Sequence, residues 1–128
     1  KENLDEAAAF AKAFAGKMNA VVAITGAIDI VADAEKAYCI YNGRPEMSSI
    51  TGTGCQLSAL TAAFVTANQE QPLEAAAAAV CAMGLSGETA YARLGELDGN
   101  ATYRNYIIDA IYRMNGEALE AGAKFEVR

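Results

Sequence analysis

Residues 50–63, ITGTGCQLSALTAA, form the pattern in this sequence that is best suited to chemistry. Gly52 and Gly54 stand two apart, just before a predicted helix. The first amides of a helix have no partners inside it, and the helix dipole favours negative charge there. Glycines also let the backbone approach an anion closely. The pattern therefore predicts a phosphate pocket, although a GxG sequence before a helix also serves as a plain turn and cap.

Cys55 follows the second glycine and falls in the first turn of the predicted helix. The amides and dipole at a helix N-terminus favour the thiolate form, so Cys55 could act as a base, a nucleophile or an oxidation-sensitive group. The alternative is a buried small hydrophobic residue, the usual role of a free cysteine. We expect that second role for Cys39, in a predicted strand, and for Cys81, in an apolar helix.

Asp29, Asp33 and Glu35 are close in sequence and could hold a metal ion. Because they belong to a predicted hairpin, we interpret them as solvated carboxylates instead. The six tyrosines lack the interleaved basic residues of a base-stacking platform. Tyr103 and Tyr106 lie on the core face of a predicted helix. We expect no site at any of these residues.

The elements that position these residues follow from hydrophobic spacing and turn signals. In chain order we predict a helix over residues 3–16, a buried strand over 20–25, two strands over 27–32 and 37–41 joined by a hairpin at 33–36, a loop over 42–50, a helix over 55–68, a helix that starts at 71, a helix that carries 103–114, and a strand over 124–128. This order predicts an α/β fold with a mixed sheet, because the hairpin adds antiparallel strands. The helix after Pro72 is apolar almost all round and should be deeply buried. Gly84 and Gly87 would let a neighbour approach it closely.

Composition and charge also argue against several classes of function. The chain is 53% hydrophobic and 20% charged, which suits one compact unit with a real core. A net charge of −6 argues against a nucleic-acid surface or an anionic membrane as partner. The longest apolar run is too short to span a membrane. There is no histidine, and the three scattered cysteines fit neither a disulfide framework nor a zinc site. Reduced cysteines in a reducing compartment are therefore expected.

TGTGC followed by LSALTAAF resembles the phosphate-binding signature of hydroxyethylthiazole kinases. Upstream, AVVAITGAIDIVAD resembles that family's strand, Thr-Gly and hairpin, and YNGRPEMSSITGTGC resembles the segment that enters its anion hole. The family belongs to the ribokinase-like superfamily, in which this turn usually ends in Asp, so Cys55 favours a thiazole kinase over sugar or pyrimidine kinases. The resemblance is weakest after Asp98. It implies that residues 1–128 are the C-terminal part of a ribokinase-like kinase domain, with a mixed, mainly parallel sheet and flanking helices.

The resemblance also implies roles for five residues. Thr25 matches the family's ATP-contacting threonine, and Gly52 matches its substrate-contacting glycine. Thr53 and Gly54 belong to the phosphate-binding turn, and Cys55 matches the catalytic position. The implied reaction is ATP-dependent phosphorylation of the hydroxyl of 4-methyl-5-(2-hydroxyethyl)thiazole for thiamine synthesis, with Mg²⁺.

Two departures from the family affect what can be assigned. Arg44 stands where family members often have His, so local loop contacts are expected to differ. The family's enzymes are also longer, and their N-terminal half carries the thiazole-contacting Met, an ATP-contacting Arg and the acidic residues near Mg²⁺. No metal ligand is therefore assignable in this chain, and we expect it to be inactive alone.

As partners, the resemblance implies the N-terminal half of the enzyme and assembly as a cytoplasmic homotrimer. Two alternatives remain open. One is a non-catalytic remnant or assembly module of this fold. The other is a kinase of the same superfamily that acts on another small alcohol.

Overall fold

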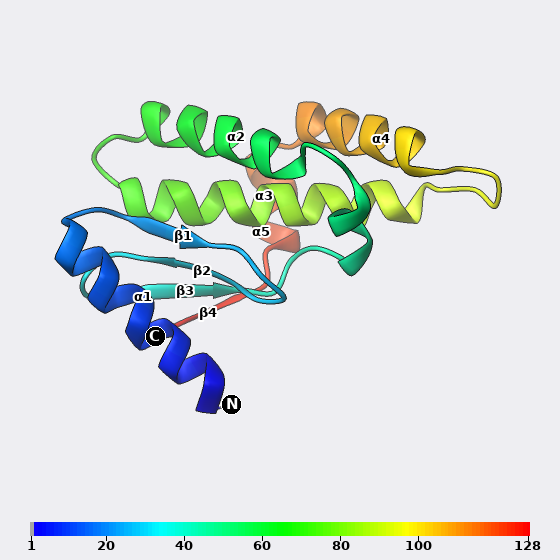
Figure 1. Ribbon diagram of the computed structural model, residues 1–128. Helices are drawn as coiled ribbons and strands as arrows, with labels where there is room; N and C mark the ends of the chain where they lie inside the picture. Colours follow the sequence, from blue (N-terminus) through cyan, green and yellow to red (C-terminus); the bar gives the residue numbers. More distant parts are fainter. Residues whose placement is uncertain (1) are drawn as a thin grey trace.

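The computed structural model describes residues 2–128 as five α-helices and a 3₁₀ helix around one four-stranded sheet (Figure 1). The elements in chain order are α1 (Glu2–Met18), β1 (Val22–Ile24), β2 (Asp29–Ala32), β3 (Ala37–Ile40), the 3₁₀ helix η1 (Pro45–Ser49), α2 (Thr53–Ala67), α3 (Pro72–Ala92), α4 (Asn100–Arg113), α5 (Gly116–Gly122) and β4 (Phe125–Val127). The predicted α/β order is confirmed, and α1 runs two residues past its predicted end. The two short helices η1 and α5 were not predicted.

The sheet has the strand order β1-β2-β3-β4, and all three described pairings are antiparallel. The predicted mixed, mainly parallel sheet is therefore wrong for the described residues. The reason lies in the connections, because parallel neighbours need a crossover of a dozen or more residues. The links from β1 to β2 and from β2 to β3 are short turns that send the chain straight back. The predicted hairpin is confirmed, since Val31 pairs with Tyr38 and Ala32 with Ala37.

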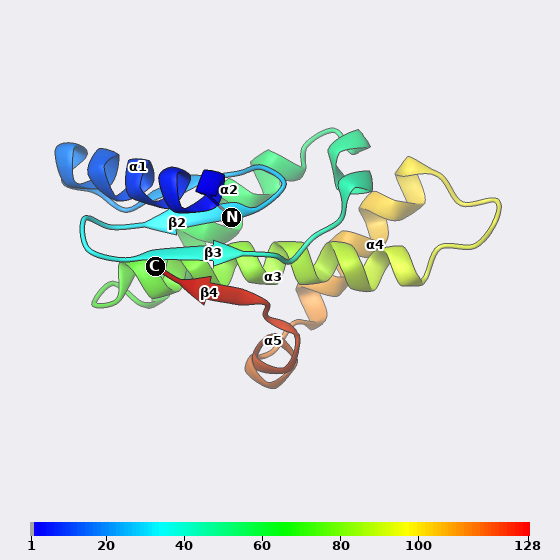
Figure 2. The same cartoon turned by 90° about the horizontal axis from the view of Figure 1, so that it is seen from below.

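Alternation along the strands directs apolar side chains to both faces of the sheet. On one face, Ala8 and Ala11 of α1 pack with Ile30 of β2 (Figure 2). On the other face, Val31 and Ile40 pack against α3. The sheet is thus covered on both sides, as expected for an α/β layer structure.

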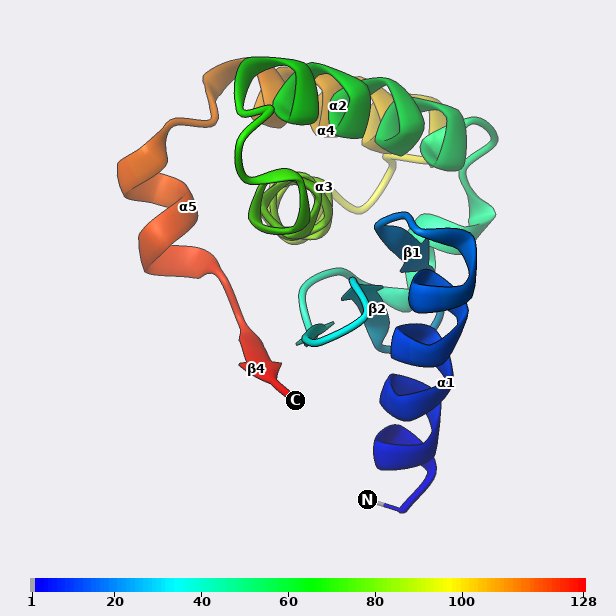
Figure 3. The same cartoon turned by 90° about the vertical axis from the view of Figure 1, so that its left-hand side faces the viewer.

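Helix α3 occupies the centre of the molecule, with the sheet on one side and α2, α4 and α5 around the rest (Figure 3). Its burial confirms the prediction from its apolar sequence. On α4, Tyr103 and Ile107 are buried against α3, so the predicted core face of that helix is also confirmed. None of the helices in residues 2–128 is long and apolar enough to cross a membrane.

Strand β1 departs from its prediction, because it is exposed rather than buried. It lies at the edge of the sheet, and Ala23 and Ile24 are both exposed. An all-apolar run is typical of a strand with neighbours on both sides, but within the described residues only β2 pairs with β1. On α1, a stripe formed by Phe10, Phe14 and Met18 is likewise exposed, by 64%, 43% and 57%.

Candidate functional site

A cavity of about 570 Å³ opens at the end of the sheet where β1 passes into β2 and where β3 leads to η1 and α2. These ends coincide because the three strands are antiparallel (Figure 1). Four segments line the cavity: Thr25, Gly26, Ala27 and Asp29 from the β1–β2 connection; Asn42, Gly43, Arg44, Pro45, Met47 and Ser48 after β3; Thr53, Gly54 and Leu57 from α2; and Val80, Met83 and Gly84 from α3. The cavity therefore gathers residues that lie far apart in the sequence.

The predicted glycine turn forms one wall of this cavity. Gly52 is the N-cap of α2 and has a left-handed backbone with φ of +97°, which glycine adopts without steric cost. Hydrogen bonding along α2 begins with the amide of Gln56, which donates to the Gly52 carbonyl at 3.0 Å. The amides of residues 53–55 precede that bond, and such amides can face an anion. Thr53 and Gly54 line the cavity beside them.

Cys55 lies in the first turn of α2, directly after the lining residues Thr53 and Gly54, and its side chain is exposed. Within residues 2–128, Cys55 is therefore not a buried small hydrophobic residue. Cys39 and Cys81 are buried, as predicted. Burial raises the pKa of both thiols, that of Cys81 to about 11. The chain thus separates one accessible thiol from two that are chemically protected.

Asp29 corrects our interpretation of the acidic residues. Asp29 begins β2 at the opposite end from the hairpin and lines the cavity, so its interpretation as a solvated hairpin carboxylate is wrong. Its side chain is half-buried, and its Oδ1 accepts a hydrogen bond from the Gly26 amide at 2.9 Å. Burial raises the pKa of Asp29, and this hydrogen bond opposes the rise. No sequence signal identified this pair, because an Asp side chain in a turn usually accepts from an amide further along the chain, not from one three residues before it.

Asp33 and Glu35 do belong to the hairpin, as predicted. Asp33 Oδ1 accepts hydrogen bonds from the amides of Glu35 and Lys36, both at 2.8 Å. These two bonds lower the pKa of Asp33. Within residues 2–128, no group of three or more His, Cys, Asp or Glu side chains is arranged to hold a metal ion. The acidic residues therefore form a turn and one cavity contact, and no metal cluster among the described residues.

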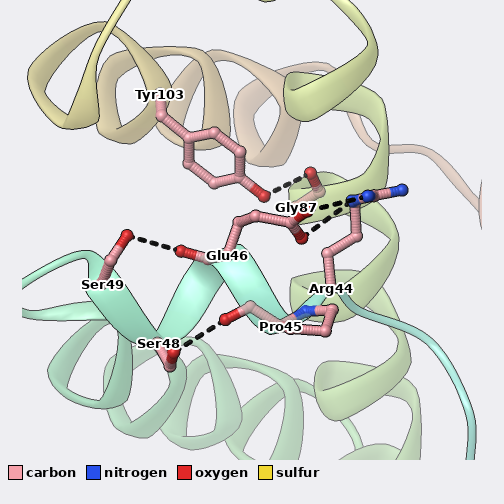
Figure 4. A network of polar contacts seen from close by, with 7 residues as sticks. All are labelled: Arg44, Pro45, Glu46, Ser48, Ser49, Gly87 and Tyr103. Atoms are coloured by element: carbon pink, nitrogen blue, oxygen red, sulfur yellow. Dashed lines mark hydrogen bonds and ion pairs between the residues drawn. The ribbon is translucent and has the colours of Figure 1, made fainter.

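The segment that leads from β3 to α2 forms another wall of the cavity, and Arg44 and Glu46 stabilise it (Figure 4). Arg44 donates from Nη2 to Glu46 Oε1 at 2.9 Å and from Nε to Oε2 at 3.1 Å. This bidentate contact lowers the pKa of Glu46 to about 2. The Arg44 guanidinium also stacks 3.9 Å from the centre of the Tyr91 ring. Arg44 is thus held against α3, while its side chain stays exposed by 39%.

The same segment lies close to α3 because that helix has glycines at the contact. A Cβ on Gly84 would stand 2.7 Å from the backbone carbon of Asn42, and one on Gly87 would stand 2.1 Å from Met47 Sδ. The predicted close approach at both glycines is confirmed. The side chain of Asn42 is buried and donates to Glu88 Oε1 at 3.2 Å and to the Gly122 carbonyl at 2.9 Å. Glu88 Oε1 also accepts a hydrogen bond from the Gly43 amide at 2.8 Å, which fixes the backbone just after β3.

The structure therefore brings three of the five predicted site residues to one cavity. Thr25 comes from the end of β1, whereas Thr53 and Gly54 come from the start of α2. Gly52 and Cys55 flank these last two in the chain and do not line the cavity. Sequence reasoning missed the contribution of Asp29 and the helical form of η1, although it placed the segment over residues 41–55 at the entrance to the anion hole.

Comparison with known proteins relates this chain to one family. The model of the hydroxyethylthiazole kinase family matches residues 1–117. A protein from Clostridium acetobutylicum named hydroxyethylthiazole kinase is 56% identical over 98% of this chain and 46% of its own length. Hydroxyethylthiazole kinase 2 of Methanosphaera stadtmanae is 39% identical over 93% of this chain and 42% of its own length.

A solved structure agrees with these matches. The hydroxyethylthiazole kinase protein from Pyrococcus horikoshii OT3 superposes with a TM-score of 0.87 at 32% identity, over 99% of this chain and 48% of that one. The superposition bears out a partial ribokinase-like α/β fold. This chain thus spans about half the length of the proteins it matches.

Proposed function

Because the chain belongs to the hydroxyethylthiazole kinase family, we propose that it supplies the phosphate-binding side of a kinase site. The reaction is the transfer of the γ-phosphoryl group of ATP to the hydroxyl of 4-methyl-5-(2-hydroxyethyl)thiazole in thiamine biosynthesis or salvage. The observation that carries the proposal is the meeting of Thr25 with the Thr53–Gly54 turn at one cavity, with the exposed thiol of Cys55 next in the chain.

The chemistry of phosphoryl transfer suits this arrangement. Such transfer depends on positioning and on stabilising charge, because its transition state is loose. The amides of residues 53–55 precede the first hydrogen bond of α2 and would receive the developing negative charge. Cys55 would accept the proton of the attacking hydroxyl late in the reaction. Thr25 would contact ATP, Thr53 and Gly54 its phosphates, and Gly52 the thiazole alcohol.

Within residues 2–128, no three His, Cys, Asp or Glu side chains are arranged to hold a metal ion. We propose, from the family resemblance, that the Mg²⁺ of this reaction class is held largely by groups outside these residues, together with the phosphates of ATP. This assignment agrees with the proposal that the chain needs a second part to act.

That second part would be the N-terminal half of a kinase domain of which these residues form the C-terminal part. The chain spans 46% of its Clostridium acetobutylicum relative. Strand β1 has an open edge with Ile24 exposed by 38%, and Phe10 and Phe14 on α1 are exposed with their rings stacked at 6.1 Å. Apolar surface of this kind marks an interface. The proposal extends to a cytoplasmic homotrimer, which the family resemblance implies.

The test uses a chimera in which this chain replaces the matching residues of the Clostridium acetobutylicum relative; we refer to it as the chimeric enzyme. It is incubated with ATP, Mg²⁺ and one of three acceptors: hydroxyethylthiazole, a pyrimidine alcohol or a sugar. Phosphorylated product is measured by mass spectrometry. We expect phosphorylated product with hydroxyethylthiazole, and none with the pyrimidine alcohol or the sugar. Preference for another acceptor would favour a different small-alcohol kinase, and a folded chimera without any product would favour a non-catalytic module.

A further inference from the structure

Asp29 is a charged residue of the cavity lining that has no role in the chemistry proposed for the site. Its carboxylate is half-buried and lies at the start of β2, where its backbone pairs with Ile40 of β3. The other charged residue of the cavity lining is Arg44, which is bound to Glu46. Among residues 2–128, Asp29 forms no ion pair. Partial burial of an unpaired polar side chain carries a free-energy cost, so packing alone gives no reason for a hydrogen-bond acceptor here.

Asp29 stabilises the connection between β1 and β2. This connection is four residues long, from Thr25 to Ile28, and three of the four line the cavity. Gly26 lies beyond the last residue of β1, so its amide is outside the strand ladder. Asp29 Oδ1 accepts a hydrogen bond from that amide at 2.9 Å. This contact ties the middle of the connection to the start of β2, which is itself fixed in the sheet.

We infer that Asp29 is a positioning residue that holds Thr25 and Gly26 in the shape that receives the nucleotide. The inference rests on the proposed function, because it assigns the ligand of that connection to ATP. Asp29 acts here through an accepting oxygen and not through its charge. An asparagine should therefore do the same work, since its Oδ1 can accept the same hydrogen bond. An alanine should not.

Asp33 provides a matched control at the other end of the same strand. It also accepts backbone hydrogen bonds through Oδ1, from Glu35 and Lys36 at 2.8 Å each. The hairpin that it stabilises does not line the cavity. Loss of Asp33 should therefore remove a comparable contact between a side chain and the backbone, without an effect on the ligand.

The experiment measures ATP affinity by calorimetry on the chimeric enzyme and on its Asp29→Ala, Asp29→Asn and Asp33→Ala variants, with thermal melting of each. We expect Asp29→Ala to weaken ATP binding about tenfold, as for the loss of one ordering hydrogen bond. Asp29→Asn should stay within about twofold to threefold of the parent, and Asp33→Ala should bind as the parent does. Equal affinity of the Asp29→Ala variant and the parent would overturn the inference.

Loss of affinity in Asp29→Asn as large as in Asp29→Ala would also overturn it, because the charge would then matter and not the accepting oxygen. The ATP affinities are compared between variants and need no turnover. Their outcome is therefore independent of the test with three acceptors. A chimera that binds ATP but leaves the thiazole unphosphorylated refutes the proposed function alone.

Discussion

Cys55 is the residue whose exposure most directly affects the proposed chemistry. It is accessible beside the cavity, whereas Cys39 and Cys81 are buried with raised pKa values. In the chimeric enzyme we expect Cys55→Ala to lower kcat about a hundredfold, at the low end of the range for general-base catalysis. ATP affinity should hardly change, because only proton acceptance is lost. Steady-state kinetics with calorimetry measures both.

Two further variants sharpen the role of Cys55. Cys55→Asp should keep substantial activity, because its carboxylate is ionised at neutral pH. Cys81→Ala should lower the melting temperature and leave kcat per folded molecule unchanged, since Cys81 is a core residue. If Cys55→Ala turns over at the native rate, the thiol has no part in the reaction.

The pKa of Asp29 makes a separate prediction about stability. Burial raises this pKa above its ordinary value of 3.8, so the folded state binds the proton more tightly than the unfolded state. The associated stability is complete below pH 3.8 and is lost as the pH rises through the raised pKa. Asp29→Asn is neutral at every pH and should therefore be more stable than the parent chain at pH 7. Urea unfolding of both at pH 7 and near pH 3.5 measures this difference, which should vanish at the lower pH. An Asn variant that is less stable at pH 7 would contradict it.

The two glycines at the start of α2 have different roles. Gly52 needs its left-handed backbone, whereas within residues 2–128 a Cβ on Gly54 would meet no atom within 4 Å outside its chain neighbours and its own helix backbone. Gly54→Val should therefore leave the melting temperature of the chimeric enzyme nearly unchanged and reduce ATP binding and turnover by more than about a hundredfold, since the side chain blocks the approach of phosphate. Gly52→Ala should instead cost about 1–2 kcal/mol of folding stability. Normal activity per folded molecule in Gly54→Val would show that the turn is only structural.

The elements also show how far sequence reasoning reached. The glycine turn, the hairpin and the burial of α3 follow from local signals: glycine spacing, alternation and an unbroken apolar run. The short helices η1 and α5 have no such periodic pattern of apolar residues. The position of η1 also depends on Gly87, which leaves space for Met47. The position of Asp29 could not be read from hairpin spacing, because its partner Gly26 lies across a connection whose shape the sheet determines. The parallel sheet came from the family resemblance, and the short strand connections already argued against it.

For the molecule as a whole, the exposed edge of β1 and the stripe of Phe10, Phe14 and Met18 predict that the isolated chain self-associates. Sedimentation at increasing concentration should show species heavier than the monomer mass of 13.4 kDa. A double variant, Phe10→Gln with Phe14→Gln, should be closer to monomeric, because it removes the stacked rings. The matched control is Tyr112→Gln on α4, an exposed aromatic outside this stripe, which should leave association unchanged. A parent chain that stays monomeric at all concentrations would contradict the prediction.

The central claim is that this chain carries the phosphate-binding side of a thiazole kinase site and needs the rest of the domain to complete it. The most direct measurement is hydroxyethylthiazole-dependent formation of ADP, in the presence of ATP and Mg²⁺, by three samples: the chain alone, the chimeric enzyme, and the chimeric enzyme with Gly54→Val. Under the proposed function, only the unmodified chimera should turn over. The groups proposed to lie outside the chain would be needed to hold the phosphoryl group in line with the alcohol, and that positioning supplies much of the rate. Clear turnover by the 128-residue chain alone, or by the Gly54→Val chimera at the parent rate, would contradict it.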